Sequence, residues 1–266
     1  MKKLLMIISV LMLISFSNVF AKSGLEIGIF VPLGLSVGID RLSYTNKKPN
    51  PDDKKETDKF NQFKTNFNNF VKKHQKNSHV GFDAGVLLHI GYRFEINKNT
   101  SFSLLGELGY SHDSFNFHVN DIMNKDKSSV FSYNFESLVF GIYPKFNYKK
   151  FSFGLAFGIK VPLYANVISS YKDYKNNYID QYVNSINAFQ MKHIFNIPII
   201  PYLKFSADYS IYENKYFAML IGAYIGGDFG MSLKNPRLTL QDSHIKRNIS
   251  SFDIGFQLGM RFLPAL

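Results

Sequence analysis

The chain has 266 residues, with 31 Lys and Arg against 20 Asp and Glu, so its formal net charge is +11. It contains no cysteine, which excludes disulfides, thiolate metal sites and cysteine nucleophiles. After the N-terminal leader, no apolar run is long enough for a transmembrane helix. If the mature chain crosses a membrane, it must therefore do so with strands that close into a barrel.

The N-terminus reads as an export signal. Lys2 and Lys3 precede an apolar run over residues 4–16, and Val19 and Ala21 provide the residues at positions −3 and −1 of a cleavage site. The apolar run is too short for a comfortable membrane helix. We predict a signal peptide over residues 1–21, cleaved after Ala21, and one mature domain over residues 22–266.

Eight stretches of the mature chain alternate apolar and small or polar residues with period two. From Leu25 to Ile39, every odd position is apolar, while the even positions include glycine, serine and glutamate. Such alternation sends apolar side chains to one face of a strand and the others to the opposite face. The predicted strands are Leu25–Ile39, about Val80–Ile96, Phe102–Tyr110, about Phe135–Tyr148, Phe151–Val167, about Phe195–Tyr209, Phe217–Phe229 and Phe252–Phe262.

The connections between these strands alternate strictly between short and long. Three are short and four are long, and the long ones are Arg41–His79, Ser111–Asn134, Ile168–His193 and Met231–Ser251. Short periplasmic turns and long outer loops are typical of an up-and-down membrane barrel. The fold class we predict is all-β: an eight-stranded antiparallel up-and-down transmembrane β-barrel in the outer membrane, with four long extracellular loops. Ten strands remain an alternative if part of the second or third long loop pairs.

A soluble barrel is the structural rival, and it would place its apolar face inside around a ligand. The second face of these strands is dominated by Gly, Ala and Ser, which suits a narrow lumen better than a water-facing exterior. Four prolines fall within the predicted strands, Pro32, Pro144, Pro162 and Pro198, and proline removes a ladder hydrogen bond. We expect them at bulges or beyond the lipid.

With this pattern the chain resembles the small eight-stranded outer-membrane barrels of the OmpA/OmpX-like superfamily. The resemblance covers nearly all of the mature chain and rests on the export signal, the eight alternating strands, the alternating loop lengths and the last strand, Phe252–Phe262. It implies contact with outer-membrane lipid and insertion by the barrel-assembly machinery. Family members usually end on an aromatic residue, whereas here four residues follow Phe262.

The lumen face carries charges of both signs. Because side chains fill the interior of an eight-stranded barrel, unpaired charges there would be costly. We predict a paired polar plug, in which Glu107 pairs with Lys145 or Lys160; an ion or solute path lined by these groups is the alternative. The plug residues are Glu26, Arg93, Glu95, Glu107, Lys145, Lys160 and Arg261.

Two of the predicted outer loops have unusual compositions. In the first, phenylalanines recur at spacings of three and four, which indicates a basic amphipathic helix suited to an anionic surface. The alternative is a helix folded over the barrel mouth. The third loop is rich in tyrosine, which suits either recognition or anchoring near headgroups. The candidate binding residues are Lys54, Lys55, Lys64, Lys72 and Lys73 in the first loop and Tyr171, Tyr174 and Tyr178 in the third.

Signs of enzymatic chemistry are few. His112 and Ser114 share an outward strand face, and this pair resembles the His-x-Ser pair of outer-membrane lipid A deacylases, with Glu136 as a candidate acid. No histidine has metal-ligand spacing and no glycine loop suits phosphate binding. We therefore expect no enzyme, no cofactor and no metal site, but a surface, adhesion or envelope-structural protein. Its expected partners are outer-membrane lipid and an anionic glycan or host surface ligand, not nucleic acid. A narrow channel for small or hydrophobic solutes is the alternative, and lipid hydrolysis comes third.

Overall fold

The structure is a computed structural model that describes residues 24–44, 54–74, 77–120, 127–173, 178–234 and 245–263. The predicted signal peptide lies outside these ranges. In the described ranges the chain forms strands with two helices between them. The elements are β1 (Gly24–Tyr44), α2 (Lys54–His74), β2 (Asn77–Asn97), β3 (Thr100–Asn120), β4 (Lys127–Tyr148), β5 (Phe151–Asp173), β6 (Tyr178–Asn187), α3 (Ala188–Ile194), β7 (Ile200–Glu213), β8 (Phe217–Ser232) and β9 (Ile245–Phe262).

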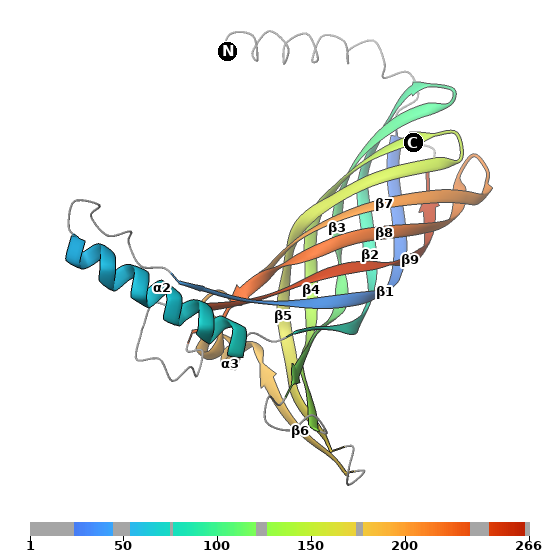
Figure 1. The fold of residues 1–266 in the computed structure, drawn as a ribbon. Helices are drawn as coiled ribbons and strands as arrows, with labels where there is room; N and C mark the ends of the chain where they lie inside the picture. The colour runs from blue at the N-terminus through green and yellow to red at the C-terminus, as the bar shows by residue number, and fades with distance from the viewer. Residues whose placement is uncertain are drawn as a thin grey trace.

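Eight strands close into a ring in the order β1, β2, β3, β4, β5, β7, β8 and β9, with β9 paired back onto β1 (Figure 1). Every neighbouring pair is antiparallel. Because the sheet is closed, each of these eight strands is paired on both sides within the barrel wall. A sheet that spans a membrane requires this. The predicted eight-stranded up-and-down transmembrane β-barrel is confirmed.

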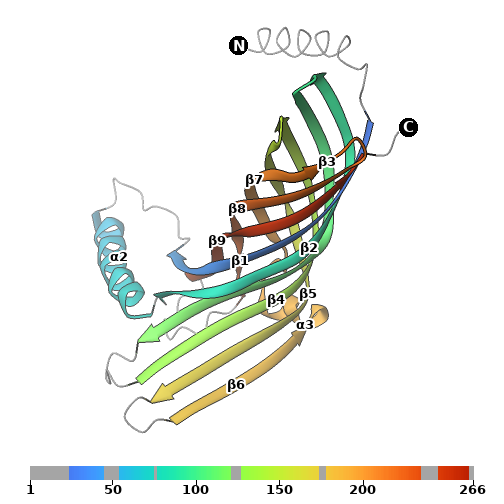
Figure 2. The same cartoon turned by 90° about the vertical axis from the view of Figure 1, so that its right-hand side faces the viewer.

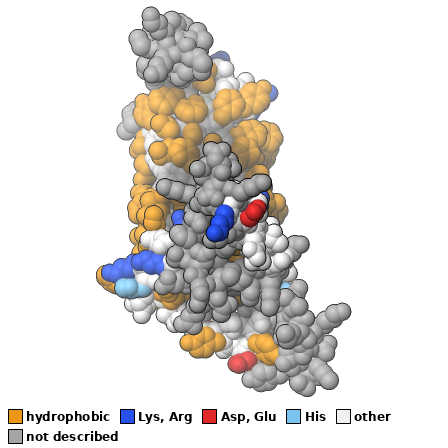
Figure 3. Space-filling model, turned by 60° about the vertical axis from the view of Figure 1, so that its left-hand side comes forward, with side chains coloured by type: hydrophobic (Ala, Val, Ile, Leu, Met, Phe, Trp, Pro, Cys, Tyr) orange, Lys and Arg blue, Asp and Glu red, His pale blue; other side chains and the backbone are white. Residues whose placement is uncertain are grey.

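The two faces of the wall separate as the alternation predicts. On β1, Leu33 and Leu35 are exposed on the outside, while Glu26, Phe30 and Ser36 are buried in the lumen. Hydrophobic side chains crowd the outer surface toward the end with the short turns (Figure 3). The lumen is narrow enough that glycine is required at points of close approach.

Gly34 is one such point. A Cβ atom placed there would lie 2.3 Å from the hydroxyl oxygen of Tyr224, which reaches across from β8. The small residues that alternate with the apolar ones therefore make room for large polar side chains inside the barrel.

The turns at one end of the barrel are short and held by side chains. Asn97 accepts a hydrogen bond from the backbone N–H of Asn99 at 2.9 Å between β2 and β3. Between β7 and β8, Asn214 accepts two from the backbone of Tyr216 and Phe217. Asparagine favours such turns because its side chain mimics a backbone acceptor. β1 begins and β9 ends at this same end, as the up-and-down prediction requires.

The prolines occupy positions where the sheet tolerates a missing donor. Pro32 pairs with β9 and Pro144 with β3, each opposite a gap in the pairing with the other neighbour. Pro162 adjoins a bulge in β5, and Pro198 precedes β7. Proline removes one ladder bond, so a site with one free side is its least costly place in a closed sheet.

The strands are longer than predicted at the end opposite the short turns. β3 continues to Asn120 and β4 begins at Lys127, so most of the predicted second loop is strand. The predicted third loop contains β6 and α3. β6 pairs with β5 over residues 164–173, beyond the part of β5 that pairs with β7, so it extends the sheet past the ring at the end opposite the short turns (Figure 2).

α2 stands apart from the barrel, beyond the end of β1 (Figures 1 and 2). The predicted helix in the first loop is therefore present, but it does not fold over the barrel mouth. No helix in the described ranges combines the length and the apolar character that a membrane crossing needs.

Candidate functional site

The lumen near the short turns holds a buried ion pair. Lys145 on β4 donates to one carboxylate oxygen of Glu26 on β1, and the Ser103 hydroxyl donates to the other at 2.6 Å. Glu26 and Lys145 are both buried, with at most 2% of either residue exposed. A buried pair is tolerated when its remaining oxygens and protons are also satisfied. Glu26 meets that condition through Ser103.

A second centre lies at Glu107 on β3. Its carboxylate accepts hydrogen bonds from His89 Nε2 at 2.6 Å and from the Tyr202 hydroxyl at 2.5 Å, and Lys204 Nζ lies 3.5 Å away. The expectation that Glu107 pairs with Lys145 or Lys160 is wrong. Alternation reveals which face a residue takes, but the partner across the lumen depends on how the closed strands are staggered.

A third centre lies nearer the long-loop end. Lys160 on β5 donates to Asp113 at 2.6 Å and to Asp228 at 2.8 Å, while Tyr224 donates to Asp83 at 2.8 Å. Four strands supply these groups, so the network ties opposite sides of the barrel together. Lys160 is 8% exposed, and its two aspartates are as well buried.

The remaining predicted plug residues lie at the short-turn end. Arg261 donates to Glu213 at 2.9 Å, and Arg93 donates to the Ser101 hydroxyl at 2.8 Å. Glu95 shares their face of the sheet and is half-buried. The structure therefore places every predicted plug residue on the lumen side.

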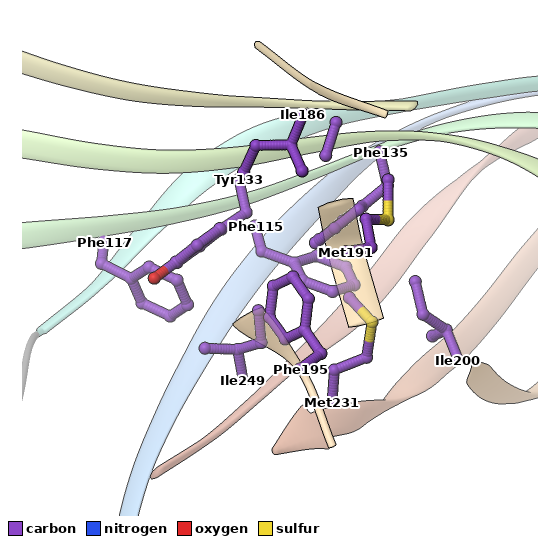
Figure 4. Packing of buried hydrophobic residues seen from close by; sticks show 11 residues of the cluster. Phe115, Phe117, Tyr133, Phe135, Ile186, Met191, Phe195, Ile200, Met231 and Ile249 are labelled. Atoms are coloured by element: carbon purple, nitrogen blue, oxygen red, sulfur yellow. The ribbon is translucent and has the colours of Figure 1, made fainter. Parts of the chain in front are cut away.

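Beyond the polar centres, toward the end opposite the short turns, the lumen is filled by an apolar cluster (Figure 4). α3 contributes Met191, and Phe195 follows it; both are fully buried among side chains from the wall. The cluster comprises Phe115, Phe117, Tyr133, Phe135, Ala165, Ile186, Met191, Phe195, Ile200, Met231 and Ile249. Hydrophobic packing and ion pairs thus occupy successive levels of the lumen.

The outer face of β3 and β4 carries a different arrangement, in which three side chains form a relay. His112 Nδ1 donates to Glu136 Oε1 at 2.6 Å, and the Ser114 hydroxyl lies 3.3 Å from His112 Nε2. His112 and Glu136 are directly opposite each other in the β3–β4 register. Their side chains are 32% and 28% exposed, whereas Ser114 is 6% exposed. The serine, the histidine and the acid have the order of a nucleophile, its base and the group that orients the base.

Two β-bulges flank this relay. One lies in the β2–β3 pairing between His79 and Asp83, beside Ser114, and the other lies in the β4–β5 pairing at Glu136. At the first bulge, a Cβ atom on Gly81 would lie 2.8 Å from the Cβ of Ser114. Bulges re-aim side chains and are common beside active sites.

Asn134 adds a polar group at the same place. It is directly opposite Ser114 on β4, and its side-chain carbonyl oxygen is buried without a hydrogen-bond partner. A buried carboxamide with an unused polar atom is uncommon in proteins and is available to a ligand. Sequence reasoning did not identify Asn134, because its proximity to Ser114 depends on the β3–β4 register.

The predicted loop residues are scattered. Lys55 and Lys64 are exposed on α2, and Tyr171 is half-buried near the end of β5. Tyr174 lies outside the described residues, and the side chains of Lys54, Lys72, Lys73 and Tyr178 are also outside them. Among the residues whose positions are described, no cluster of three or more His, Asp or Glu side chains is arranged to hold a metal ion.

The chain folds as an eight-stranded antiparallel β-barrel with an apolar outer face. Comparison with solved structures returns barrels from outer membranes. Ail of Yersinia pestis, solved with the heparin analogue sucrose octasulfate, is 11% identical over 88% of this chain and 99% of its own, with a TM-score of 0.27. The outer membrane protease OmpT from Escherichia coli is 9% identical over 91% and 97%, with a TM-score of 0.36. OprG from Pseudomonas aeruginosa is 11% identical over 92% and 99%, with a TM-score of 0.30. No protein-family model and no curated protein sequence matches the chain.

Proposed function

We propose that this barrel hydrolyses acyl esters of lipids in the outer leaflet, with Ser114 as the nucleophile. The observation that carries the proposal is the relay from Ser114 through His112 to Glu136 on the outer face of the wall. The proposal departs from the sequence-based expectation of a non-enzymatic protein, which remains untested.

The geometry suits acyl transfer. The Ser114 oxygen would attack the ester carbonyl carbon while His112 Nε2 takes the hydroxyl proton, and Glu136 would hold the imidazole with Nδ1 protonated. The proton then passes from Nε2 to the departing alcohol as the C–O bond breaks. Water, deprotonated by the same nitrogen, cleaves the acyl-serine and releases a fatty acid. Asn134 lies opposite Ser114, and its side-chain amide N–H, not its carbonyl oxygen, would be the group that donates to the developing oxyanion.

The height of the relay on the wall indicates the substrate class. His112 lies ten residues along β3 from Phe102, an outward aromatic residue at the short-turn end. At a rise of about 3.3 Å per residue and a tilt of about 45°, that separation is about 23 Å along the membrane normal. The apolar band of such barrels is about 25 Å tall. The relay therefore lies at the outer boundary between acyl chains and headgroups, where lipid ester bonds are found.

The test is ester cleavage by the purified, refolded barrel. We would measure fatty-acid release from phosphatidylglycerol vesicles and from vesicles containing lipid A, and hydrolysis of p-nitrophenyl octanoate in detergent. Ser114→Ala should lower the rate by about 10³-fold or more, as loss of a catalytic serine does in related chemistry. Ser132→Ala, on the same outer face of β4 but outside the relay, is the matched control.

A serine-directed fluorophosphonate provides a readout that is independent of substrate. It should label Ser114 in the wild type and in Ser132→Ala, and mass spectrometry would locate the adduct. Absence of both labelling and ester cleavage in a barrel that shows folded gel mobility would overturn the proposal. The lipid that is cleaved would identify the substrate.

A second candidate function is contact with an anionic surface through α2. This helix carries six lysines and two acidic residues, a net +4, and stands beyond the barrel wall with Lys55 and Lys64 exposed. A basic helix held above the outer surface suits an anionic glycan or lipid phosphate. By contrast, the channel alternative is disfavoured by the ion pairs and apolar side chains that occupy the described lumen.

Binding to dextran sulfate tests this second candidate. Lys55→Glu with Lys64→Glu should weaken binding at 50 mM salt, and the difference should shrink at 500 mM salt because screening is then stronger. Lys98→Glu with Lys149→Glu, in the short turns at the opposite end, is the matched control. Equal binding by both double variants would exclude α2 as the contact.

A further inference from the structure

We propose that Tyr110 is a positioning residue for the relay, which holds the Glu136 carboxylate in place for His112. The catalytic role of this contact rests on the proposed function. The contact itself is given by the geometry of the outer wall. The Tyr110 hydroxyl donates a hydrogen bond to Glu136 Oε2, the oxygen that His112 does not use. Both carboxylate oxygens are therefore engaged, one by the tyrosine and one by the imidazole.

The register explains how one carboxylate meets both groups. Glu136 is directly opposite His112, and Leu138, the next outward residue on β4, is opposite Tyr110. His112 is thus the direct cross-strand neighbour of Glu136, and Tyr110, two residues away on the same face of β3, is its diagonal neighbour. Diagonal cross-strand neighbours are about 7–8 Å apart, which a tyrosine side chain can span.

A carboxylate at this site needs a second restraint. Glu136 is 28% exposed and has rotatable bonds that would let it turn toward the headgroup layer. At a membrane boundary, where hydration falls away toward the acyl chains, a fixed carboxylate keeps the imidazole in one tautomer and orientation. Tyr110 supplies that restraint from the side of Glu136 that is nearer the short turns and the apolar band.

The alternative role for Tyr110 is that of an ordinary interfacial aromatic residue. Outward tyrosines are common where a barrel meets headgroups, and 43% of Tyr110 is exposed. That role depends on the ring and not on a bond to Glu136. Tyr110→Phe keeps the ring and removes only the donor, so it separates the two roles. Tyr92→Phe, a similarly exposed tyrosine on β2, is the matched control.

The direct test is nuclear magnetic resonance of the His112 imidazole in the refolded barrel. The Nδ1 proton held by Glu136 should give a downfield resonance in the wild type and in Tyr92→Phe. Tyr110→Phe should broaden or shift that resonance, because the carboxylate is no longer fixed. An unchanged resonance in Tyr110→Phe would overturn the inference, whether or not the protein hydrolyses esters.

Kinetics provide the second readout. Tyr110→Phe should lower kcat about tenfold, equivalent to about 1.4 kcal/mol, with KM little changed. Combined with Glu136→Gln, it should add almost nothing, because both changes act through the same carboxylate. An undiminished effect in the Glu136→Gln background would contradict the positioning role. Absence of Ser114 labelling in the wild type would instead count against the hydrolase proposal. Failure of the positioning role and failure of the hydrolase proposal therefore give different results.

Discussion

Replacing Glu107 with alanine should destabilise the barrel without opening it. The carboxylate is 1% exposed and accepts hydrogen bonds from His89 and Tyr202, with Lys204 at 3.5 Å. Removing it leaves Lys204, whose side chain is 13% exposed, without its carboxylate and leaves two donors without an acceptor. Breaking a buried pair by deleting one partner costs about 3–5 kcal/mol. Although this value comes from soluble proteins, the lumen of this barrel is comparably enclosed.

Urea unfolding of the refolded barrel, followed by gel mobility of the folded form, measures the loss. With an m-value of about 2 kcal/mol per molar, a loss of 4 kcal/mol lowers the midpoint by about 2 M. Glu107→Gln is the control, because it keeps an acceptor for Tyr202 and should lose less. The current across a planar bilayer should stay low in the wild type and in both variants.

Two outcomes would refute this reasoning. A midpoint for Glu107→Ala within experimental error of the wild type would mean that the network does not stabilise the fold. Large, steady currents through the wild-type barrel would mean that the charged groups line a water-filled path, and the channel alternative would then replace the plug.

Three further predictions follow from the wall and the lumen. Single cysteines at Lys64 and Asn99 should react differently with an impermeant maleimide on intact cells, with labelling at Lys64 alone; labelling at Asn99 alone would reverse the orientation. Met191→Ala should cost about 2–5 kcal/mol in the same urea assay, because the methionine is fully buried in the apolar cluster; a loss below 1 kcal/mol would mean that α3 is loosely packed. Gly141→Ala should also destabilise the barrel, because its Cβ would lie 2.1 Å from the Tyr202 hydroxyl; an unchanged midpoint would show that this ring can move aside.

The sequence predicted the barrel well because the alternation of apolar and small residues reports directly on the two faces of a strand. Glu26, Lys145 and Arg261 follow that alternation, and the structure places all three in the lumen. The strand ends opposite the short turns carry the inverse signal. There Phe115, Phe117 and Tyr133 face the lumen while polar residues alternate with them on the outside, so the stretch does not continue the apolar outer face and was predicted as a loop.

Contacts between strands were harder to predict than faces. His112 and Ser114 share a strand, so their spacing is visible in the sequence, whereas Glu136, named there only as a candidate acid, joins them through the β3–β4 register. That register depends on the length of both strands and of the loop between them, and both strand ends were misjudged. The same limit explains why Lys145 was not assigned to Glu26, which lies 119 residues away in the chain.

The seam between β1 and β9 has a consequence for how this chain becomes a barrel. It joins residues 24–44 to residues 245–262, the most distant pair of strands in the chain. Until the last strand arrives, β1 and whichever strand was made most recently expose unpaired N–H and C=O groups, which hydrocarbon cannot satisfy. Local hairpins can form early, but the closing contact carries the largest loop-closure cost and comes last. A chain stalled or cut before Ile245 would therefore have two open edges, which favours pairing with other chains over insertion.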